Sequence, residues 1–353
     1  MVKYSMSSHS PVGQSGFDTD VFIVGGGPAG LAAGIAARRK GMRVVIADGN
    51  KPPVDKACGE GLMPDSREAA ARLGIVFPKA VGFEFRGIRF LDAGRSVTAE
   101  FPHGRGIGIR RTVLHETLMQ TAVDAGVELR WNMPVPDIEG IKARWIIGAD
   151  GSGSRVRRWA GLDTFVGNTR RFAYRQHYAM VPWTDRMEVY WGQDCQMYIT
   201  PVGPSEICVA LISRKPELRI AEALEREFPV LRERLAHQPV SSRERGAITA
   251  TMRLRAVARG NVALIGDASG SVDAITGDGL CLSFRQAELL ADAMEQGDLS
   301  LYDRAYPRLV FRPHLMSKTM LLLDRGSAIR RLALGTMSAQ PWIFKKLLAF
   351  HVA

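Results

Sequence analysis

Cysteine is scarce in this sequence, and its spacing excludes two classes of protein. The four cysteines among 353 residues are scattered, without a C-x-x-C pair and without histidines at the spacing of metal ligands: Cys58, Cys195, Cys208 and Cys281. This pattern argues against a disulfide framework and against a zinc site. We therefore expect no metal and a location in the reducing cytoplasm.

Long uninterrupted apolar runs are missing as well. The apolar stretch at residues 21–37 is broken by glycines and a proline, so it predicts a strand and a helix instead of a membrane-spanning helix. Residues 1–16 are rich in Ser and Gly and lack an apolar core, which indicates a flexible leader and not a signal peptide. Basic runs interleaved with aromatic residues are also absent, which argues against nucleic-acid binding.

Positive charge is in excess, and much of it lies at the carboxyl end. The formal net charge is +11, which suits an anionic ligand such as a dinucleotide, or a membrane surface. From residue 304 onward, nine Lys and Arg residues stand against one acid, among apolar residues at helical spacing. Two interpretations remain open. These helices pack over a substrate domain with a solvated basic face, or they make a peripheral contact with the inner face of a membrane.

The strongest local signal is a strand followed by a glycine-rich loop. Residues 21–24 form a continuous apolar run, which is typical of a strand buried on both faces of a parallel sheet. Glycines at G-x-G-x-x-G spacing allow a tight turn, the close approach of a pyrophosphate, and close packing of the next helix on the strand. Free N–H groups at the start of that helix bind phosphates. The loop contributes five candidate binding residues: Gly25, Gly27, Pro28, Ala29 and Gly30.

An acid follows at the end of the second predicted strand, residues 43–47. Asp48 lies close to the spacing expected for a carboxylate that binds a ribose 2′-OH. The strand, the glycine loop, the helix and this acid together predict a dinucleotide site. The structural alternative is a helix opened by a glycine-rich turn that binds nothing.

Two later strands end in polar motifs. Residues 145–149 lead into Asp150-Gly151, and residues 260–265 lead into Gly266-Asp267. The carboxyl ends of the strands in a doubly wound sheet converge on one crevice. We therefore expect these motifs and the glycine loop to meet at one site.

The remaining pattern predicts an α/β protein with two further parts. Residues 81–101 alternate as a β-ribbon, and four strand-like segments between 171 and 213 fit an antiparallel sheet over a substrate cavity. The predicted boundaries are 17–78, 102–168 and 250–300 for a discontinuous dinucleotide-binding domain with a parallel sheet, 79–101 and 169–249 for the substrate domain, and 301–353 for a C-terminal helical segment.

Three residues have alternative explanations. Arg111 stands at the start of a predicted helix, where the helix dipole disfavours a cation. Either an anion is bound nearby and Arg111 contacts a phosphate or ribose, or Arg111 is a solvated arginine. Cys58 is either a small buried residue or a thiol near a redox centre. Glu60, between two glycines, belongs to backbone held close to a ligand or to another chain segment, or to a plain surface turn.

The order of these motifs, from about residue 20 to 295, resembles the FAD-dependent oxidoreductases of the aromatic-hydroxylase (group A flavin monooxygenase) and geranylgeranyl reductase superfamily. The resemblance implies a Rossmann-like FAD-binding domain in which the glycine loop holds the FAD diphosphate. It implies that Asp48 binds the adenosine ribose and Asp267 the ribitol chain. Arg111 would lie on a helix that contacts FAD, and Asp150-Gly151 would touch FAD and be linked to the use of NADPH or NADH.

Two segments look most like the geranylgeranyl reductase branch, in which both flank the isoalloxazine ring: Cys58-Gly59-Glu60-Gly61 and Thr276-Gly277-Asp278-Gly279-Leu280. The resemblance thereby completes the set of candidate cofactor-binding residues with Cys58, Gly59, Gly266, Gly277, Gly279 and Leu280. In one departure, a proline usual after the Gly-Asp motif is replaced by Ala274, so the local backbone near the flavin is not predicted.

The resemblance implies an FAD enzyme, reduced by NADPH or NADH, that acts on a hydrophobic small molecule. The leading prediction is a monooxygenase that hydroxylates a hydrophobic or aromatic substrate. The alternative is a reductase of isolated carbon–carbon double bonds of an isoprenoid. A non-catalytic dinucleotide-sensing module is a rival that needs only the first strand–helix–strand unit. No catalytic acid or base is assigned, because a lone histidine on a sheet, such as His177, is more often structural.

Overall fold

The parallel sheet predicted around the glycine loop is present in the structure. The computed structural model describes residues 17–92 and 94–352, so the predicted leader lies outside the described residues. Six strands form the sheet in the order β15–β16–β9–β1–β2–β8, and all neighbours are parallel except β15 with β16. Their bounds are β1 (Thr19–Val24), β2 (Val44–Ala47), β8 (Glu128–Arg130), β9 (Ala143–Gly148), β15 (Ala258–Arg259) and β16 (Val262–Leu264).

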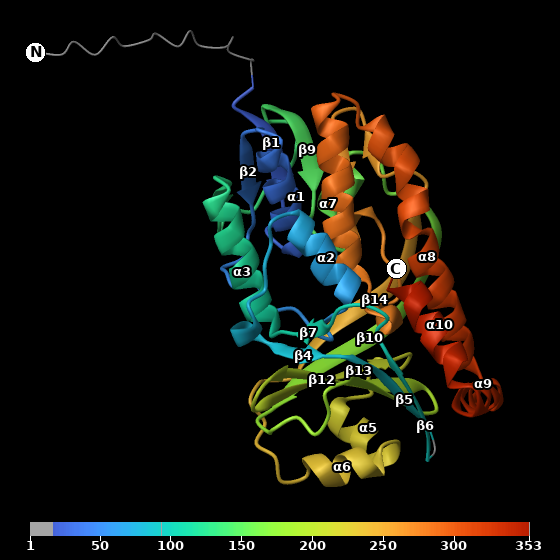
Figure 1. Cartoon of the computed structure of the whole chain (residues 1–353). Helices are drawn as coiled ribbons and strands as arrows, with labels where there is room; N and C mark the ends of the chain where they lie inside the picture. The colour runs from blue at the N-terminus through green and yellow to red at the C-terminus, as the bar shows by residue number, and fades with distance from the viewer. Residues whose placement is uncertain (1–16, 93, 353) are drawn as a thin grey trace, which may run out of the picture.

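Both faces of this sheet are buried, which explains the continuous apolar run in β1. Val21 and Ile23 of β1 face a core shared with four helices and with Tyr302 at the start of a fifth, and Phe22 and Val24 face a second core on the other side. The helices of the first face are α1 (Pro28–Arg39), α2 (Pro64–Arg72), α3 (Arg111–Asp124) and α7 (Gly279–Glu295). The short helix α4 (Arg155–Trp159) lies on the second face. The doubly wound arrangement is therefore confirmed (Figure 1).

A second sheet of seven strands forms the substrate part, in the order β14–β10–β13–β12–β11–β5–β6. Its neighbours are antiparallel except β11 with β5, which are parallel. That exception arises because the hairpin β5–β6 comes from much earlier in the chain and adds to the free edge of β11. The bounds are β5 (Gly87–Asp92), β6 (Arg95–Glu100), β10 (Phe165–Tyr178), β11 (Met187–Trp191), β12 (Cys195–Gly203), β13 (Glu206–Ser213) and β14 (Arg245–Leu254).

The second sheet is also buried on both faces. On β13, Ile207, Val209 and Leu211 pack against helices α5 (Ile220–Arg226) and α6 (Pro229–Leu235). The alternate residues of the strand point to the opposite face, because side chains in a strand alternate. That opposite face meets the C-terminal helices, so β13 separates two hydrophobic cores.

A small three-stranded sheet joins the two large ones. It consists of β3 (Gly61–Leu62), β7 (Gly106–Gly108) and β4 (Phe83–Phe85), with a short 3-10 helix, η1 (Lys79–Val81), before β4. A Cβ on Gly108 would lie 1.8 Å from the Pro201 carbonyl oxygen. The close approach of β7 to β12 therefore requires glycine at this position, and it fixes the substrate sheet against the cofactor part.

Three helices cover one side of the molecule (Figure 1): α8 (Ser300–Arg325), α9 (Ser327–Ala339) and α10 (Pro341–His351). Helix α8 runs from the parallel sheet toward the substrate sheet, and α9 and α10 lie against β6. A buried ion pair and a buried carboxylate hold these helices on the substrate sheet. Arg330 of α9 binds Asp92 of β5 at 2.9 Å, and the carboxylate of Asp324 in α8 accepts hydrogen bonds from Gln196 and from the more exposed Arg214. The predicted packing of these helices over the substrate sheet is present.

The predicted fold class, α/β with a parallel sheet, a separate antiparallel sheet and C-terminal helices, is confirmed. The domain boundaries stay a prediction, and β14 crosses the one placed at residue 250. Among the described helices, none combines the length and the apolar character that crossing a membrane requires.

Candidate active site

One continuous cavity of about 670 Å³ begins at the carboxyl ends of the parallel strands and extends to the substrate sheet and the C-terminal helices. Thirteen of the fifteen residues predicted from the sequence line it: Gly25, Gly27, Pro28, Ala29, Asp48, Cys58, Gly59, Arg111, Asp150, Asp267, Gly277, Gly279 and Leu280. The expected convergence of the separate motifs on one site is therefore seen. Gly30 and Gly266 lie outside the lining.

The glycine loop has the geometry that the sequence pattern requires. Gly25 has a φ of +113°, and a Cβ there would lie 2.4 Å from the Ala149 carbonyl oxygen. A Cβ on Gly30 would lie 1.9 Å from the carbonyl oxygen of Gly25, so this glycine allows α1 to pack on β1. A Cβ on Gly27 would meet no described atom within 4 Å. Gly27 therefore leaves open space before the N-terminus of α1.

His115 supports the glycine loop, and its position there was not predicted from the sequence. It is fully buried on α3, and its Nε2 lies 2.8 Å from the carbonyl oxygen of Gly26. Burial lowers the pKa of His115, so the neutral ring donates its Nε2–H to this carbonyl. The contact ties α3 to the glycine loop. The histidine stands 89 positions after Gly26, and no local pattern connects them.

Asp48 anchors the same loop from the end of β2. Its Oδ2 accepts the N–H of Gly26 at 2.7 Å, and its Oδ1 accepts the N–H of Asn50 at 2.7 Å. The carboxylate lies in the cavity wall. Its position agrees with a ribose contact, which stays a prediction.

Asp150 holds the turn after β9. Its Oδ1 accepts the hydroxyl of Ser154 at 2.5 Å, and its Oδ2 accepts the N–H groups of Arg155 and Val156 at 2.7 and 3.2 Å. These acceptors satisfy the first turn of α4, whose N–H groups would otherwise lack partners. The side chain therefore positions the loop that carries Gly151 into the cavity wall.

Asp267 lies in the short 3-10 helix η2 (Gly266–Ser269) that follows β16. Its carboxylate forms an ion pair with Lys56 at 3.1 Å, and both side chains are more than two-fifths exposed. Lys56 also lines the cavity and was not predicted, because the loop before Cys58 carries no local signal. Gly266, in contrast, lies behind the lining against α1. It has a φ of +62°, and a Cβ there would lie 2.5 Å from Ala29 Cβ, so glycine allows this close approach.

Asp267→Ala is expected to weaken FAD binding by about 1–3 kcal/mol, because a polar group of the ligand loses its partner. Equilibrium titration of the apoprotein with FAD measures the change. Asp124→Ala is the matched control and should leave the affinity unchanged, because this exposed acid lies outside the cavity lining. An unchanged affinity in Asp267→Ala would remove this residue from the site.

The loop before α7 closes another side of the cavity. It contains η3 (Ala274–Thr276), and Gly277 follows in the left-handed region with a φ of +75°. Gly279 begins α7, so the N-terminus of this helix lies in the wall, as expected. Asp278 is buried behind the loop, and burial raises the pKa of its carboxyl. His351 of α10, which also lines the cavity, lies 3.1 Å from the Thr276 carbonyl oxygen.

Arg111 begins α3, where the helix dipole favours a negative charge, and a carboxylate of the chain lies there. The carboxylate of Glu60 accepts the backbone N–H of Arg111 at 3.0 Å, at the N-terminus of the helix. The Arg111 side chain lines the cavity, and its Nε is buried without a hydrogen-bond partner among the described residues. A phosphate or ribose contact of this side chain stays a prediction.

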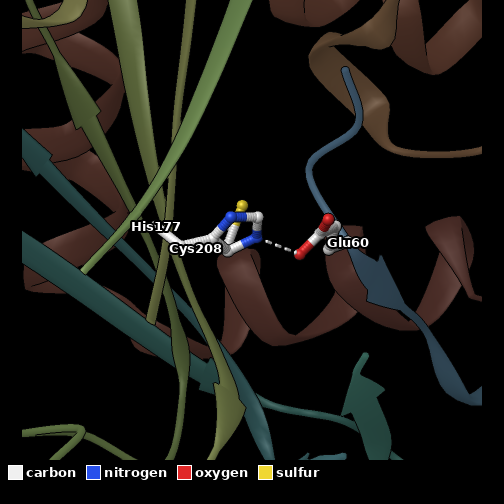
Figure 2. A group of neighbouring side chains, drawn as sticks. All are labelled: Glu60, His177 and Cys208. Carbon is white, nitrogen blue, oxygen red and sulfur yellow. Dashed lines mark hydrogen bonds and ion pairs between the residues drawn. The ribbon is translucent and has the colours of Figure 1, made fainter. Parts of the chain in front are cut away.

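Glu60 also joins a buried polar cluster that the sequence did not reveal. Its Oε2 lies 2.6 Å from Nε2 of His177, and both side chains are fully buried (Figure 2). Arg175 lies beside them, with its Nη1 3.2 Å from His177 Nδ1. His177 was assigned no role from the sequence, since its partner stands 117 positions away.

Cys58 lies in the cavity wall and is half-buried. A second thiol approaches it, because Cys208 Sγ lies 3.8 Å from the Cys58 carbonyl oxygen, although both cysteines are free. Burial raises the pKa of the Cys208 thiol well above its ordinary value, so it stays protonated.

Cys58→Ser is therefore expected to keep flavin reduction by the electron donor, because both cysteines are free and burial raises the pKa of the neighbouring Cys208 thiol. Anaerobic stopped-flow absorbance at the flavin band measures this rate, with Cys195→Ser, which is outside the cavity lining, as control. Complete loss of reduction with FAD still bound would show that the Cys58 thiol is chemically required.

The far part of the cavity is apolar. The substrate sheet contributes Ile88, Phe90, Met187, Val189, Tyr198, Ala210 and Ile212. The C-terminal helices contribute Met316, Met320, Leu323, Met337, Phe344, Leu347 and Leu348. The helical residues were not predicted as lining, although the spacing of Met316, Met320 and Leu323 places them on one face of α8.

The open loop at Gly27 and the unpartnered Nε of Arg111 both fit a phosphate-bearing dinucleotide. The cavity is also within the size range of small-molecule and cofactor sites. The fold and the site together define an α/β dinucleotide-binding protein with a substrate sheet.

Comparison with known proteins narrows this class. Two family models, each described as an FAD binding domain, match residues 20–71 and residues 119–296. The second match covers just over half of the chain. The chain belongs to the FAD binding domain family, and it is an FAD-dependent oxidoreductase.

Similar proteins include both reductases and monooxygenases. The menaquinone reductase of Mycolicibacterium smegmatis is 26% identical over 326 residues, which cover 82% of this chain and 80% of that protein. The digeranylgeranylglycerophospholipid reductase of Methanothrix thermoacetophila is 28% identical and covers 79% of each chain. The rifampicin monooxygenase of Streptomyces venezuelae is 28% identical, over 43% of this chain and 36% of that protein. Among solved structures, p-nitrophenol 4-monooxygenase PnpA of Pseudomonas putida shares the fold, with a TM-score of 0.79, 18% identity and coverage of 94% and 95%.

Proposed function

We propose that the protein is an NAD(P)H-dependent FAD monooxygenase that hydroxylates a hydrophobic or aromatic small molecule. The observation that carries this proposal is the continuous cavity, in which the candidate cofactor residues and an apolar wall share one space. Three aromatic side chains, Phe90, Tyr198 and Phe344, line the apolar part, which favours a substrate with a ring. Relatives that are hydroxylases or monooxygenases support the reaction class.

The proposed roles follow from position. When bound, FAD supplies the electron-transfer chemistry that amino-acid side chains lack. The glycine loop and the N-terminus of α1 bind its diphosphate, Asp48 binds the adenosine ribose, and Asp267 binds the ribitol chain. The N-terminus of α7 places positive dipole at the flavin and favours negative charge there. Helices α8 and α10 exclude water from the apolar part.

A second candidate is the reduction of isolated carbon–carbon double bonds in an isoprenoid. The specific observation in its favour is the coverage of a relative: the match to digeranylgeranylglycerophospholipid reductase extends over 79% of each chain. The segments around Cys58 and Gly277, which resemble the same branch, both lie in the cavity wall.

Product analysis tests the proposal and separates the two reactions. The enzyme is incubated with NADPH and, in parallel, with a panel of phenols bearing alkyl chains and a panel of polyprenyl compounds. The proposal predicts oxygen consumption that matches substrate-dependent NADPH oxidation, and a product one oxygen atom heavier than its substrate. A product two hydrogen atoms heavier, formed without oxygen, would contradict the proposal and support the second candidate.

We also propose that the outer surface of α9 and α10 makes a peripheral contact with an anionic lipid surface. Large apolar side chains are exposed there, including Leu332 at 74% and Trp342 at 56%. Lys345 and Lys346 are exposed beside them, and the Lys346 ammonium lies 5.0 Å from the centre of the Trp342 ring. Leu347 is 40% exposed and also lines the cavity. An apolar substrate would thus reach the cavity from the lipid.

The double variant Lys345→Gln/Lys346→Gln is expected to bind anionic vesicles about 30-fold more weakly, since each basic residue near anionic lipid contributes about 1 kcal/mol. Co-sedimentation with phosphatidylserine-containing vesicles at low salt measures it. The exposed residues Lys142 and Arg243, changed to Gln together, provide a control of equal charge. Point substitutions test the contact more specifically than deletion of α10, because Phe344 and Leu348 of this helix form part of the cavity wall. Full-length protein that ignores such vesicles would refute the contact.

A further inference from the structure

Glu60 has an unusual backbone conformation for a residue with a side chain. Its φ is +58°, and the residue is 2% exposed. A residue other than glycine in this region is strained by about 1–3 kcal/mol and persists only where its surroundings hold it. The surroundings here do so, because the Glu60 carbonyl oxygen accepts the N–H of Ile109 at 2.9 Å and its carboxylate has the two bonds already described.

The hydrogen bonds around His177 define which nitrogen donates to Glu60. Arginine can only donate, so the contact from Arg175 Nη1 makes Nδ1 of His177 an acceptor. The hydroxyl of Ser242 lies 2.7 Å from the same Nδ1 and donates to it as well. In the neutral ring the proton is then on Nε2, which donates to Glu60 Oε2 at 2.6 Å. Figure 2 shows this bond between the substrate strand and the loop of Glu60.

Glu60, His177 and Cys208 lie close enough to suggest metal ligands, since one ligand atom of each lies within 4.8 Å of the others. The surrounding charges oppose that role. The guanidinium of Arg175 lies 3.6 Å from Glu60 Oε1 and contacts His177, so a cation already faces the group. The thiol of Cys208 keeps its proton because of burial. The cluster is thus a set of hydrogen bonds and ion pairs.

The cluster joins the two halves of the protein at the cofactor cavity. His177 and Arg175 come from β10 of the substrate sheet, whereas Glu60 precedes β3 and Arg111 begins α3. Asp55 holds Arg175 from the loop before Glu60, and Arg245 of β14 binds Asp55 at 2.8 Å. The remaining nearby charges, Arg110 and Glu206, pair with each other at 2.6 Å.

We propose that Glu60 is a positioning residue for the FAD site, which acts through Arg111. Its carboxylate binds the backbone N–H of Arg111, fixes the first turn of α3, and so directs the Arg111 guanidinium into the cavity. His177 keeps the carboxylate in place from the substrate sheet. This inference rests on the proposed FAD contact of Arg111, and it links the substrate sheet to the affinity of the protein for FAD.

The test is the dissociation constant of FAD, measured by titration of the apoprotein with flavin fluorescence. Glu60→Gln should bind FAD about 10- to 100-fold more weakly, because the amide cannot accept from both Arg111 N–H and His177 Nε2–H. His177→Leu should have a similar effect, whereas His177→Gln, whose amide still donates, should stay within about threefold of the wild type. Cys208→Ala is the matched control, because this thiol lies against the same ring and makes no bond to Glu60.

Measuring Glu60→Gln in a protein that also carries Arg111→Ala distinguishes a positioning role of Glu60 from a merely structural one. If Glu60 acts through Arg111, Glu60→Gln should change FAD affinity by less than about threefold once Arg111 is alanine. Thermal unfolding of each apoprotein reports any general loss of folding. An unchanged affinity in Glu60→Gln, an equal penalty in the Arg111→Ala background, or a stoichiometric metal lost in His177→Leu would each overturn the proposal. Wild-type protein that binds no FAD would instead overturn the proposed function, and this inference with it.

Discussion

Gly27→Val is expected to give a folded protein that no longer retains FAD. A Cβ at Gly27 meets no described atom within 4 Å, and the residue has a φ of −70°, which any amino acid adopts. The side chain would therefore fit the protein but occupy the space before the N-terminus of α1. Loss of about two charge-assisted hydrogen bonds to the diphosphate, each about 1.5–3 kcal/mol, weakens binding roughly 100- to 10,000-fold.

Circular dichroism measures whether the variant is folded, and the flavin absorbance of the purified protein measures how much FAD it retains. Gly140→Val is the matched control, since Gly140 is exposed, lies outside the cavity and also has free space at its Cβ. Bound FAD at wild-type affinity in Gly27→Val would show that the diphosphate lies elsewhere.

Gly30→Val is expected to destabilise the fold itself, instead of blocking the cofactor site. Its Cβ would lie 1.9 Å from the Gly25 carbonyl oxygen, and backbone cannot yield as a flexible side chain can. Forcing α1 away from β1 should lower the free energy of unfolding by about 3 kcal/mol or more, which corresponds to a fall in Tm of at least roughly 4 °C for a chain of this length.

Differential scanning calorimetry of the apoprotein measures that fall, so that FAD binding does not contribute. The Gly27→Val apoprotein is the internal comparison and should keep the wild-type Tm. A Gly30→Val variant with an unchanged Tm would contradict the close packing of α1 on β1.

The cofactor half was predictable because its signals are local. A buried strand, a glycine loop and a helix stand within twenty consecutive residues, and each later motif follows its own strand directly. Parallel strand ends converge by topology, so the separate motifs could be brought to one cavity without knowledge of any side-chain contact. Thirteen of the fifteen predicted residues line that cavity, and the other two are glycines at close approaches.

The remaining features depend on contacts between distant parts of the chain. The parallel pairing of β5 with β11 joins residues about one hundred positions apart, and no period-2 pattern specifies a partner strand. The bond between Glu60 and His177 likewise has no sequence signal, because each residue alone has an ordinary structural explanation. For Arg111, the helix dipole made a nearby anion one of two alternatives, and no local pattern indicated that the carboxylate of Glu60 lies at this helix start.

The C-terminal helices had two alternative interpretations. Packing over the substrate sheet is what the structure shows, and the contact with a membrane stays a prediction. Arg330 is buried against Asp92, whereas Lys345 and Lys346 remain exposed beside Trp342. Charge and hydropathy define such a segment, but only tertiary packing decides which of its residues are covered.

The flavin content of the purified protein tests the central claim most directly. We expect yellow protein with a flavin absorption spectrum, and release of about one FAD per chain on denaturation, as one cavity with one glycine loop implies. Protein that is colourless, fails to bind added FAD, and binds NAD alone would contradict the account and leave an ordinary dinucleotide-binding fold.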